Sequence, residues 1–176
     1  GYFDETIQPL ASAYAIRNAC IQKKDIEITT PMKEELLHSS YVTMDMFYPY
    51  IRTYLMMTPS SKLSEYFLIS EGIENHLKKN AEKCATYQEF IQACVNYRYT
   101  ASKIRRCLVQ IMMQITKEDV KNLPKLDTLR ILAFSNKGRE WLHSKRKEEV
   151  HIASKFAEIP KSYRDIEFQA TQLYTS

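Results

Sequence analysis

Residues 97–117 concentrate positive charge in a stretch that contains no acidic residue. Spacings of three and four residues place its apolar and its basic side chains on different sides of a helix. A basic face of this kind can follow the phosphates of a nucleic acid. The same pattern is typical of a core helix whose long cationic side chains stay in water, and the stretch alone does not separate the two interpretations.

Two tyrosines stand at the start of this predicted helix, Tyr97 and Tyr99. Its apolar side consists of Ile104, Leu108, Ile111 and Ile115. Its cations are Arg98, Lys103, Arg105, Arg106 and Lys117. Aromatic rings beside cations can stack on unpaired bases, as RNA recognition often requires, although either tyrosine could equally pack inside the fold.

A second basic cluster, residues 137–147, carries five cations against one acid, Glu140. The net charge of the whole chain is only +4, so the uneven placement of the cations is what favours a polyanionic partner. If the two clusters lie side by side, each phosphate that they neutralise adds about 0.9 to the log–log salt slope of binding. The candidate contacts in this cluster are Lys137, Arg139, Lys145 and Arg146.

A third candidate site lies near the N-terminus, where the small residues of 11–15 lead into a predicted helix that contains Arg17. Backbone N–H groups at a helix start, the Ser12 hydroxyl and a nearby cation together suit a phosphate group. A plain helix that is capped by Ser12 explains the same residues without any ligand.

Other kinds of site find no support in the sequence. The four histidines lack metal-binding spacing, and the four cysteines form no C-x-x-C pair. Three isolated glycines cannot supply a P-loop or a dinucleotide-binding loop. We therefore predict no metal site and no catalytic residue in the chain, and we interpret the cysteines as buried thiols rather than a disulfide framework.

The elements that must position these residues are predicted to be mostly α-helical, because only three glycines and six prolines occur in 176 residues. One or two short strands are expected near 128–134 and 150–155, and Trp141 and Leu142 are expected to face inward. No apolar run of 18 residues occurs, so we expect a soluble, cytoplasmic protein without a membrane segment. The expected helices cover 11–22, 31–38, 44–57, 71–85, 87–97, 100–123, 137–147 and 164–174.

Several segments, in order along the chain, resemble one family, the bacterial tRNA(Met) cytidine acetate ligases. They cover most of the chain, and their joint occurrence is more specific than any one of them. The segments are SAYAIR at 12–17, EGIENHL at 71–77, YQEFI at 87–91, RYT at 98–100 with Arg106, LAFSNKGREWL at 132–142 and DIEFQATQLY at 165–174.

The resemblance implies a two-part, ATP-dependent enzyme. A nucleotidyltransferase-like domain would activate acetate as acetyl-adenylate, with Mg²⁺ as a possible companion of ATP. The acetyl group would then pass to the wobble cytidine of elongator tRNA(Met) and form N4-acetylcytidine. A helical C-terminal region would help to hold the tRNA.

The chain also departs from the family pattern. The H-x-G-H signature is absent, so the resemblance predicts a C-terminal portion that lacks the N-terminal nucleotidyltransferase domain and catalyses nothing alone. Residues 1–30 would be the tail end of the catalytic domain, and residues 31–176 the helical tRNA-binding domain. In the family-like segment S-A-T-x-I-R, Tyr14 replaces threonine, which removes a small hydroxyl from the phosphate side. Ser12 and Arg17 remain the expected nucleotide contacts.

The expected tRNA contacts come from both basic clusters, and Tyr97 or Tyr99 is the candidate for base stacking. Arg98 and Arg139 could instead stabilise the fold through ion pairs. Two alternatives remain open, a non-catalytic RNA-binding adaptor and a protein–protein scaffold whose basic faces meet acidic partners. The predicted contacts are Arg98, Tyr99, Lys103, Arg105, Arg106, Lys137, Arg139, Lys145 and Arg146.

Overall fold

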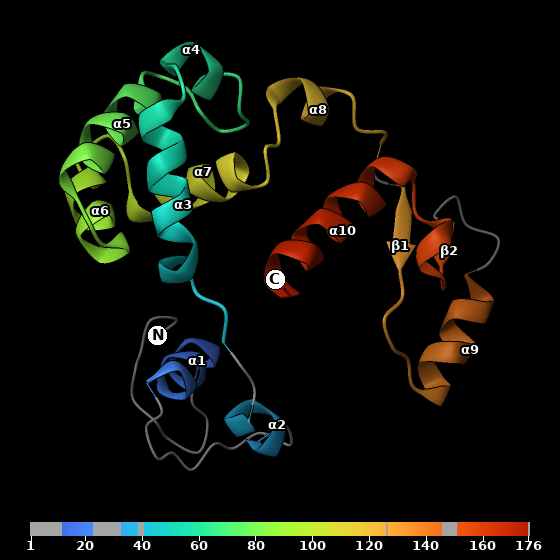
Figure 1. The fold of residues 1–176 in the computed structure, drawn as a ribbon. Helices are drawn as coiled ribbons and strands as arrows, with labels where there is room; N and C mark the ends of the chain where they lie inside the picture. The colour runs from blue at the N-terminus through green and yellow to red at the C-terminus, as the bar shows by residue number, and fades with distance from the viewer. Residues whose placement is uncertain (1–11, 23–32, 39–40, 126, 146–150, 176) are drawn as a thin grey trace. The chain divides into compact units, whose positions relative to one another are not determined.

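The computed structural model describes residues 12–22, 33–38, 41–125, 127–145 and 151–175 (Figure 1). The chain forms two compact units, Gly1–Thr43 (unit 1) and Met44–Ser176 (unit 2). The predicted boundary between residues 30 and 31 lies outside the described residues and stays a prediction.

Unit 1 contains two helices, α1 (Ala13–Ile21) and α2 (Lys33–His38). Ala19 and Cys20 of α1 are buried, and Ile16, Leu36 and Tyr41 pack against them. The spacing of Ile16, Ala19 and Cys20 is that of one helical face, so the period read from the sequence gives the packed side of α1.

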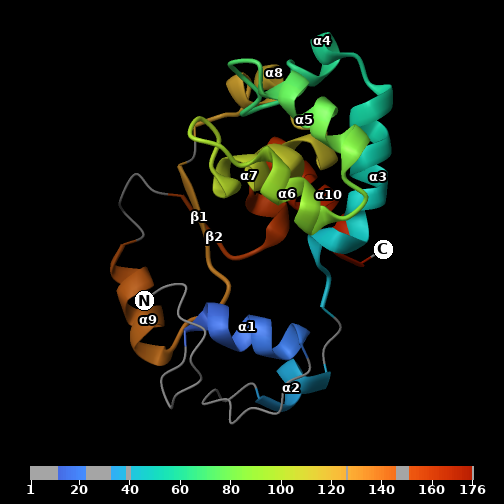
Figure 2. The ribbon, with the colours of Figure 1, turned by 90° about the vertical axis from the view of Figure 1, so that its left-hand side faces the viewer.

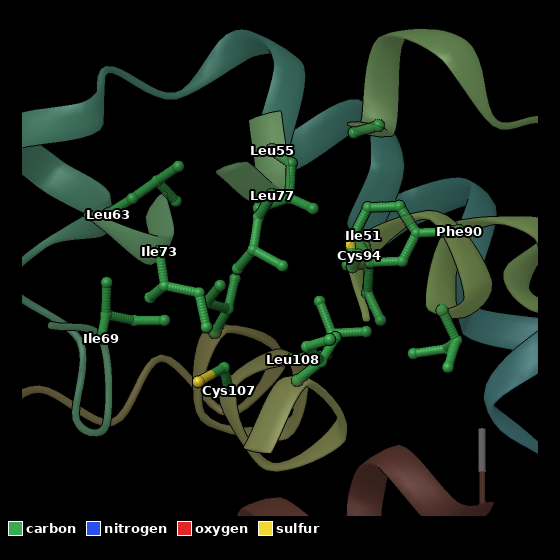
Figure 3. Close-up of a cluster of buried hydrophobic side chains, with 14 of the residues drawn as sticks. Ile51, Leu55, Leu63, Ile69, Ile73, Leu77, Phe90, Cys94, Cys107 and Leu108 are labelled. Carbon is green, nitrogen blue, oxygen red and sulfur yellow. The ribbon is translucent and has the colours of Figure 1, made fainter. Parts of the chain in front are cut away.

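Unit 2 is built around four helices that enclose one core. They are α3 (Met44–Met57), α5 (Ile73–Lys83), α6 (Tyr87–Cys94) and α7 (Ala101–Met112), and the short α4 (Ser60–Leu63) packs on α5. Helix α3 contacts α5, α6 and α7, while α6 contacts both α5 and α7. Side chains from these helices point into one apolar cluster, in which Leu55, Leu77 and Leu108 are fully buried (Figure 3).

The cysteines belong to these buried surfaces, and all four are free thiols. Burial raises the pKa of the Cys94 thiol to about 12 and also raises the pKa of Cys107. A thiol that stays protonated is a poor nucleophile, so these cysteines act as small apolar residues. The interpretation of the cysteines as buried thiols is confirmed.

The long basic helix predicted for 100–123 is wrong in its length. Helix α7 ends at Met112, and Gln114 adopts a left-handed conformation with φ of 51°. Thr116 then begins a new helix, α8 (Lys117–Lys121), through a capping box with Asp119. The link between the helices pairs with an earlier segment, because the Lys117 N–H donates to the Glu65 carbonyl at 2.9 Å. This long-range pairing is stronger than local helix propensity at the break.

The C-terminal part of unit 2 contains a βαβ arrangement. Strands β1 (Thr128–Arg130) and β2 (His151–Ala153) are parallel, with Leu129 opposite Ile152, and α9 (Asn136–Ser144) lies between them in the sequence. A 3₁₀ turn (Phe156–Glu158) and the last helix, α10 (Lys161–Thr175), follow. The prediction of a mostly α fold with short strands near 128–134 and 150–155 is confirmed.

Helix α10 connects this part to the four-helix core. The Gln169 side chain donates to the Met113 carbonyl at 3.0 Å, and the Tyr163 hydroxyl donates to the Pro124 carbonyl at 2.7 Å. The Arg130 guanidinium of β1 forms an ion pair with Glu167 of α10. Within the parts of the chain that the structure describes, no helix has the length and apolar character needed to span a bilayer.

Candidate nucleic-acid interface

A tight turn between α6 and α7 displays the first residues of the basic stretch. The Asn96 side-chain oxygen accepts hydrogen bonds from the Arg98 N–H at 2.8 Å and the Tyr99 N–H at 2.9 Å. The Asn96 N–H in turn donates to the Tyr99 carbonyl at 3.1 Å. An asparagine that bonds to the backbone two and three residues later fixes a turn. The turn leaves Tyr97 wholly exposed and Arg98 exposed at its tip.

Tyr99 anchors this turn to the core. Its side chain is only 5% exposed, and its hydroxyl donates to the Glu71 carbonyl at 2.7 Å. Its ring lies 5.4 Å from the imidazole of His76, whose Nε2 is 2.9 Å from the Cys94 carbonyl oxygen. The Tyr99 ring is therefore not available for base stacking in this conformation, and of the two alternatives for this residue the structure favours packing inside the fold. Tyr97 is the tyrosine whose ring is available.

The cations of α7 point to different sides of the helix. The Lys103 ammonium lies 3.5 Å from the Glu71 carboxylate and 5.3 Å from the centroid of the Tyr99 ring. Arg105 hydrogen-bonds to the Tyr87 hydroxyl, and it opposes the rise in the Tyr87 pKa that burial causes. Arg106 is exposed on the outer ridge, where its Nε donates to the Ser102 carbonyl at 3.2 Å. On α7, Arg106 is thus the cation that faces solvent, while Lys103 and Arg105 each contact a neighbouring side chain.

We call four residues of this region the turn surface: the exposed Tyr97, Arg98 and Arg106, and the partly exposed Lys103. It lies at the N-terminal end of α7, whose first turn carries no acidic residue. The helix dipole makes this end positive, and cations near it are unfavourable by about 0.3–1 kcal/mol each at exposed sites. The helix dipole therefore does not explain why Arg98 and Lys103 lie at this end of α7.

The second basic cluster lies on α9, which Ser135 caps by accepting a hydrogen bond from the Gly138 N–H at 3.2 Å. Lys137 and Arg139 are exposed, Lys145 is partly exposed, and Arg146 lies outside the described residues. Helices α7 and α9 lie apart in both views of unit 2, so the two clusters do not form the continuous stripe considered above (Figures 1 and 2).

In unit 1, the Ser12 hydroxyl accepts a hydrogen bond from the Ala15 N–H at 3.1 Å and so caps α1. Arg17 is exposed on the same face of α1 as Ala13, one turn farther along. The geometry accounts for Ser12 as a helix cap, and it leaves the Arg17 side chain facing outward at the middle of α1.

Among the described residues, no group of three histidine, cysteine or carboxylate side chains gathers closely enough to hold a metal ion.

The sequence interpretation missed three residues that shape the turn surface, namely Glu71, His76 and Asn96. Asn96 carried a usable signal, because asparagine before a helix start is a common turn former. It also placed Trp141 inward, which is wrong, since 58% of this side chain is exposed.

Comparison of the sequence with known protein families shows the class to which the chain belongs. A family model described as HIGH Nucleotidyl Transferase matches residues 1–176, and the chain belongs to this family. The expectation that the nucleotidyltransferase part is missing from the chain is therefore wrong, because the match extends over the whole of it, including the N-terminal residues.

The individual relatives are tRNA(Met) cytidine acetate ligases, as the resemblance implied. The protein of that name from Limosilactobacillus reuteri is 30% identical over 179 residues, which cover 98% of this chain and 48% of the relative. The Mycoplasmopsis synoviae protein of that name is 37% identical over 114 residues, which cover 65% of this chain and 37% of the relative. The chain spans about half the length of the curated relatives that cover nearly all of it.

Solved structures show the same fold. The apo crystal structure of Thermotoga maritima TmcAL has a TM-score of 0.76 at 23% identity and covers 97% of this chain and 47% of its own. The structure of Thermotoga maritima TmcAL bound with alpha-thio ATP has a TM-score of 0.72 at 22% identity and covers 95% and 47%. The helical core with its small parallel sheet is thus part of a nucleotidyltransferase-like fold rather than a separate helical domain.

The two tyrosines of the turn give a direct test of this geometry. Changing Tyr99 to Ala should lower the free energy of unfolding by about 3 kcal/mol, because it empties a buried site and removes a hydrogen bond. Changing Tyr97 to Ala should alter it by less than about 0.5 kcal/mol, because that ring makes no buried contact. Urea unfolding followed by circular dichroism measures both values, and equal effects would contradict the assignment.

Proposed function

We propose that unit 2 binds tRNA through the turn surface, as the tRNA-holding part of a tRNA(Met) cytidine acetate ligase. The observation that carries the proposal is the rigid display of Tyr97 and Arg98 beside further cations at a helix start that lacks acidic residues. The names of the relatives support tRNA as the polyanion.

The side chains of the turn surface have distinct roles in this proposal. Arg98 and Arg106 bind backbone phosphates, which arginine can contact with two parallel hydrogen bonds. Tyr97 stacks on an unpaired base. Lys103 adds charge but is partly neutralised by Glu71, and Arg105 is held by Tyr87, so we expect both to contribute less.

The cluster on α9 is proposed as a second contact region. Lys137 and Arg139 are exposed there, and Lys145 lies at its end. Arg146 is included on the basis of the sequence alone. Because α9 lies apart from α7, one tRNA would have to reach both clusters with different parts of its structure (Figure 2).

The reaction proposed for the enzyme has two steps. The carboxylate oxygen of acetate attacks the α-phosphorus of ATP, forming acetyl-adenylate and releasing pyrophosphate. The N4 amine of the wobble cytidine in elongator tRNA(Met) then attacks the acetyl carbon, and AMP leaves as the amine loses a proton. Mg²⁺ would accompany ATP. We assign neither step to a residue of this chain, and the inactivity of residues 1–176 alone stays a prediction.

For the nucleotide, we propose contacts from Ser12 and Arg17 of unit 1. The support is the exposed Arg17, which lies one turn after Ala13 on the same face of α1, and the ATP analogue bound by a protein of the same fold. The Ser12 hydroxyl already caps the helix, so its part is to hold the free N–H groups toward a phosphate rather than to bind it alone.

The tRNA proposal predicts a charge-dependent loss of binding. Changing Arg98 and Arg106 together to Glu should weaken binding of tRNA(Met) roughly tenfold or more, and it should lower the log–log salt slope by about 1.5–2. Gel-shift titrations at two salt concentrations measure both effects, and circular dichroism checks that the helices are retained.

A matched control is Lys121→Glu, since Lys121 is an exposed cation on α8, beyond the other end of α7. This change alters the net charge in the same direction but should leave most of the binding intact. Equal losses from both regions, or tRNA binding without salt dependence, would count against the turn surface. The latter result would favour the scaffold alternative.

The nucleotide proposal predicts that Arg17→Gln weakens ATP binding by roughly tenfold or more, because one charge-assisted contact is lost. Arg17→Lys keeps the positive charge but loses the planar guanidinium, so its ATP affinity should lie between those of the unchanged chain and Arg17→Gln. Calorimetric titration with ATP measures the affinity. Unchanged ATP affinity in Arg17→Gln would exclude this role.

A further inference from the structure

The βαβ part of unit 2 exposes large apolar side chains that a solvated surface does not require. Leu129, Leu132, Phe134 and Trp141 are 58%, 82%, 54% and 58% exposed. They follow one another along β1, the link to α9 and α9 itself. Contiguous exposed apolar groups of this kind are typical of binding surfaces.

Two neighbouring cavities hollow this surface. A cavity of about 600 Å³ lies between the segment 129–135 and α9, where Trp141 and Lys145 line it. A second cavity of about 420 Å³ is lined by Arg139 and His143. Phe134 lines both, as do Ile131, Leu142 and Ile152, so one apolar wall separates them. Their volumes lie in the range of small-ligand sites.

The charged side chains of the lining, Arg130, Arg139 and Lys145, are all cations. Arg130 and Lys145 line the first cavity, Arg139 and His143 the second, and no carboxylate belongs to either lining among the described residues. Arg130 is engaged with Glu167, whereas Glu140 of α9 does not line either cavity. A flat apolar wall with cations around it suits an aromatic ring that carries a negative charge nearby.

The apolar wall shared by the two cavities depends on close packing of Phe134 against Gly138 in the first turn of α9. A Cβ at Gly138 would lie 3.3 Å from the Cβ of Phe134, closer than ordinary contact. The absence of a side chain at Gly138 therefore allows the first turn of α9 to lie against Phe134, which in turn faces both cavities.

We propose that this paired cavity binds an unstacked nucleobase of single-stranded RNA. The base lies against Trp141 and Phe134, and the adjoining phosphates meet Lys145 and Arg139. The choice of RNA as occupant rests on the proposed tRNA-binding function, together with the complementary charge of the lining. A duplex cannot occupy the site, because its bases are stacked and paired.

The chain offers a direct probe, since Trp141 is its single tryptophan. Titration of the chain with an eight-nucleotide oligocytidylate should quench Trp141 fluorescence, and an RNA duplex of the same length should not. Trp141→Ala should weaken binding of the single strand roughly 5- to 100-fold, whereas Trp141→Phe, which keeps a ring, should weaken it less. Circular dichroism of the variants checks folding.

Three results would overturn the inference. These are equal quenching by duplex and single strand, single-strand binding that Trp141→Ala leaves unchanged, and a Trp141 emission that shifts with protein concentration alone, which would indicate a second copy on this surface.

The test of the cavity is independent of the test of the turn surface. If tRNA binding depends on Arg98 and Arg106 but not on Trp141, the cavity proposal alone fails. If Trp141 responds to the single strand while Arg98 and Arg106 are dispensable, the turn-surface proposal alone fails.

Discussion

The hydrogen bond from the buried Tyr99 hydroxyl to the Glu71 carbonyl is the contact on which the basic surface depends. It joins the turn before α7 to the segment before α5, and the ring of Tyr99 packs on His76 behind it. Asn96 then closes the turn from within. Tyr99 thus fixes one end of the turn in the core, and the Arg98 guanidinium at the tip lies 5.7 Å from the centroid of the Tyr99 ring. A surface held in advance loses less conformational entropy on binding.

The residue that accepts this hydrogen bond, Glu71, has a strained backbone and also pairs with a cation of the basic stretch. Glu71 adopts a left-handed conformation with φ of 58°, which is uncommon for a residue with a side chain, and Gly72 follows at 81°. The Tyr99 hydroxyl holds the Glu71 carbonyl, while the Glu71 carboxylate meets Lys103. Strained residues of this kind persist where the surroundings over-determine them, often near functional sites. The Glu71 carboxylate thus offsets part of the positive charge beside the turn.

Helical periodicity predicted much of the fold because it reflects burial on a single element. Ile104, Leu108 and Ile111 were assigned to the packed side of α7, and all three are buried. Periodicity could not show that Tyr99, which shares the spacing of Lys103 and Arg106, is drawn inward by a partner 28 residues away. It also could not foresee the end of α7 at Met112, where the chain pairs with residues 65–67, nor the outward position of Trp141. The family resemblance gave the class of protein but wrongly predicted that its nucleotidyltransferase part is missing, because a missing signature says little about the extent of a fold.

The central claim is that the turn surface holds tRNA. Hydrogen–deuterium exchange of the chain, with and without tRNA(Met), tests it most directly because it reports on each segment in one experiment. If the turn surface holds tRNA, the amides in residues 97–106 should exchange more slowly when tRNA is bound, with α3 and the buried face of α5 unchanged. Saturating tRNA that slows exchange elsewhere but leaves residues 97–106 unaffected would contradict it.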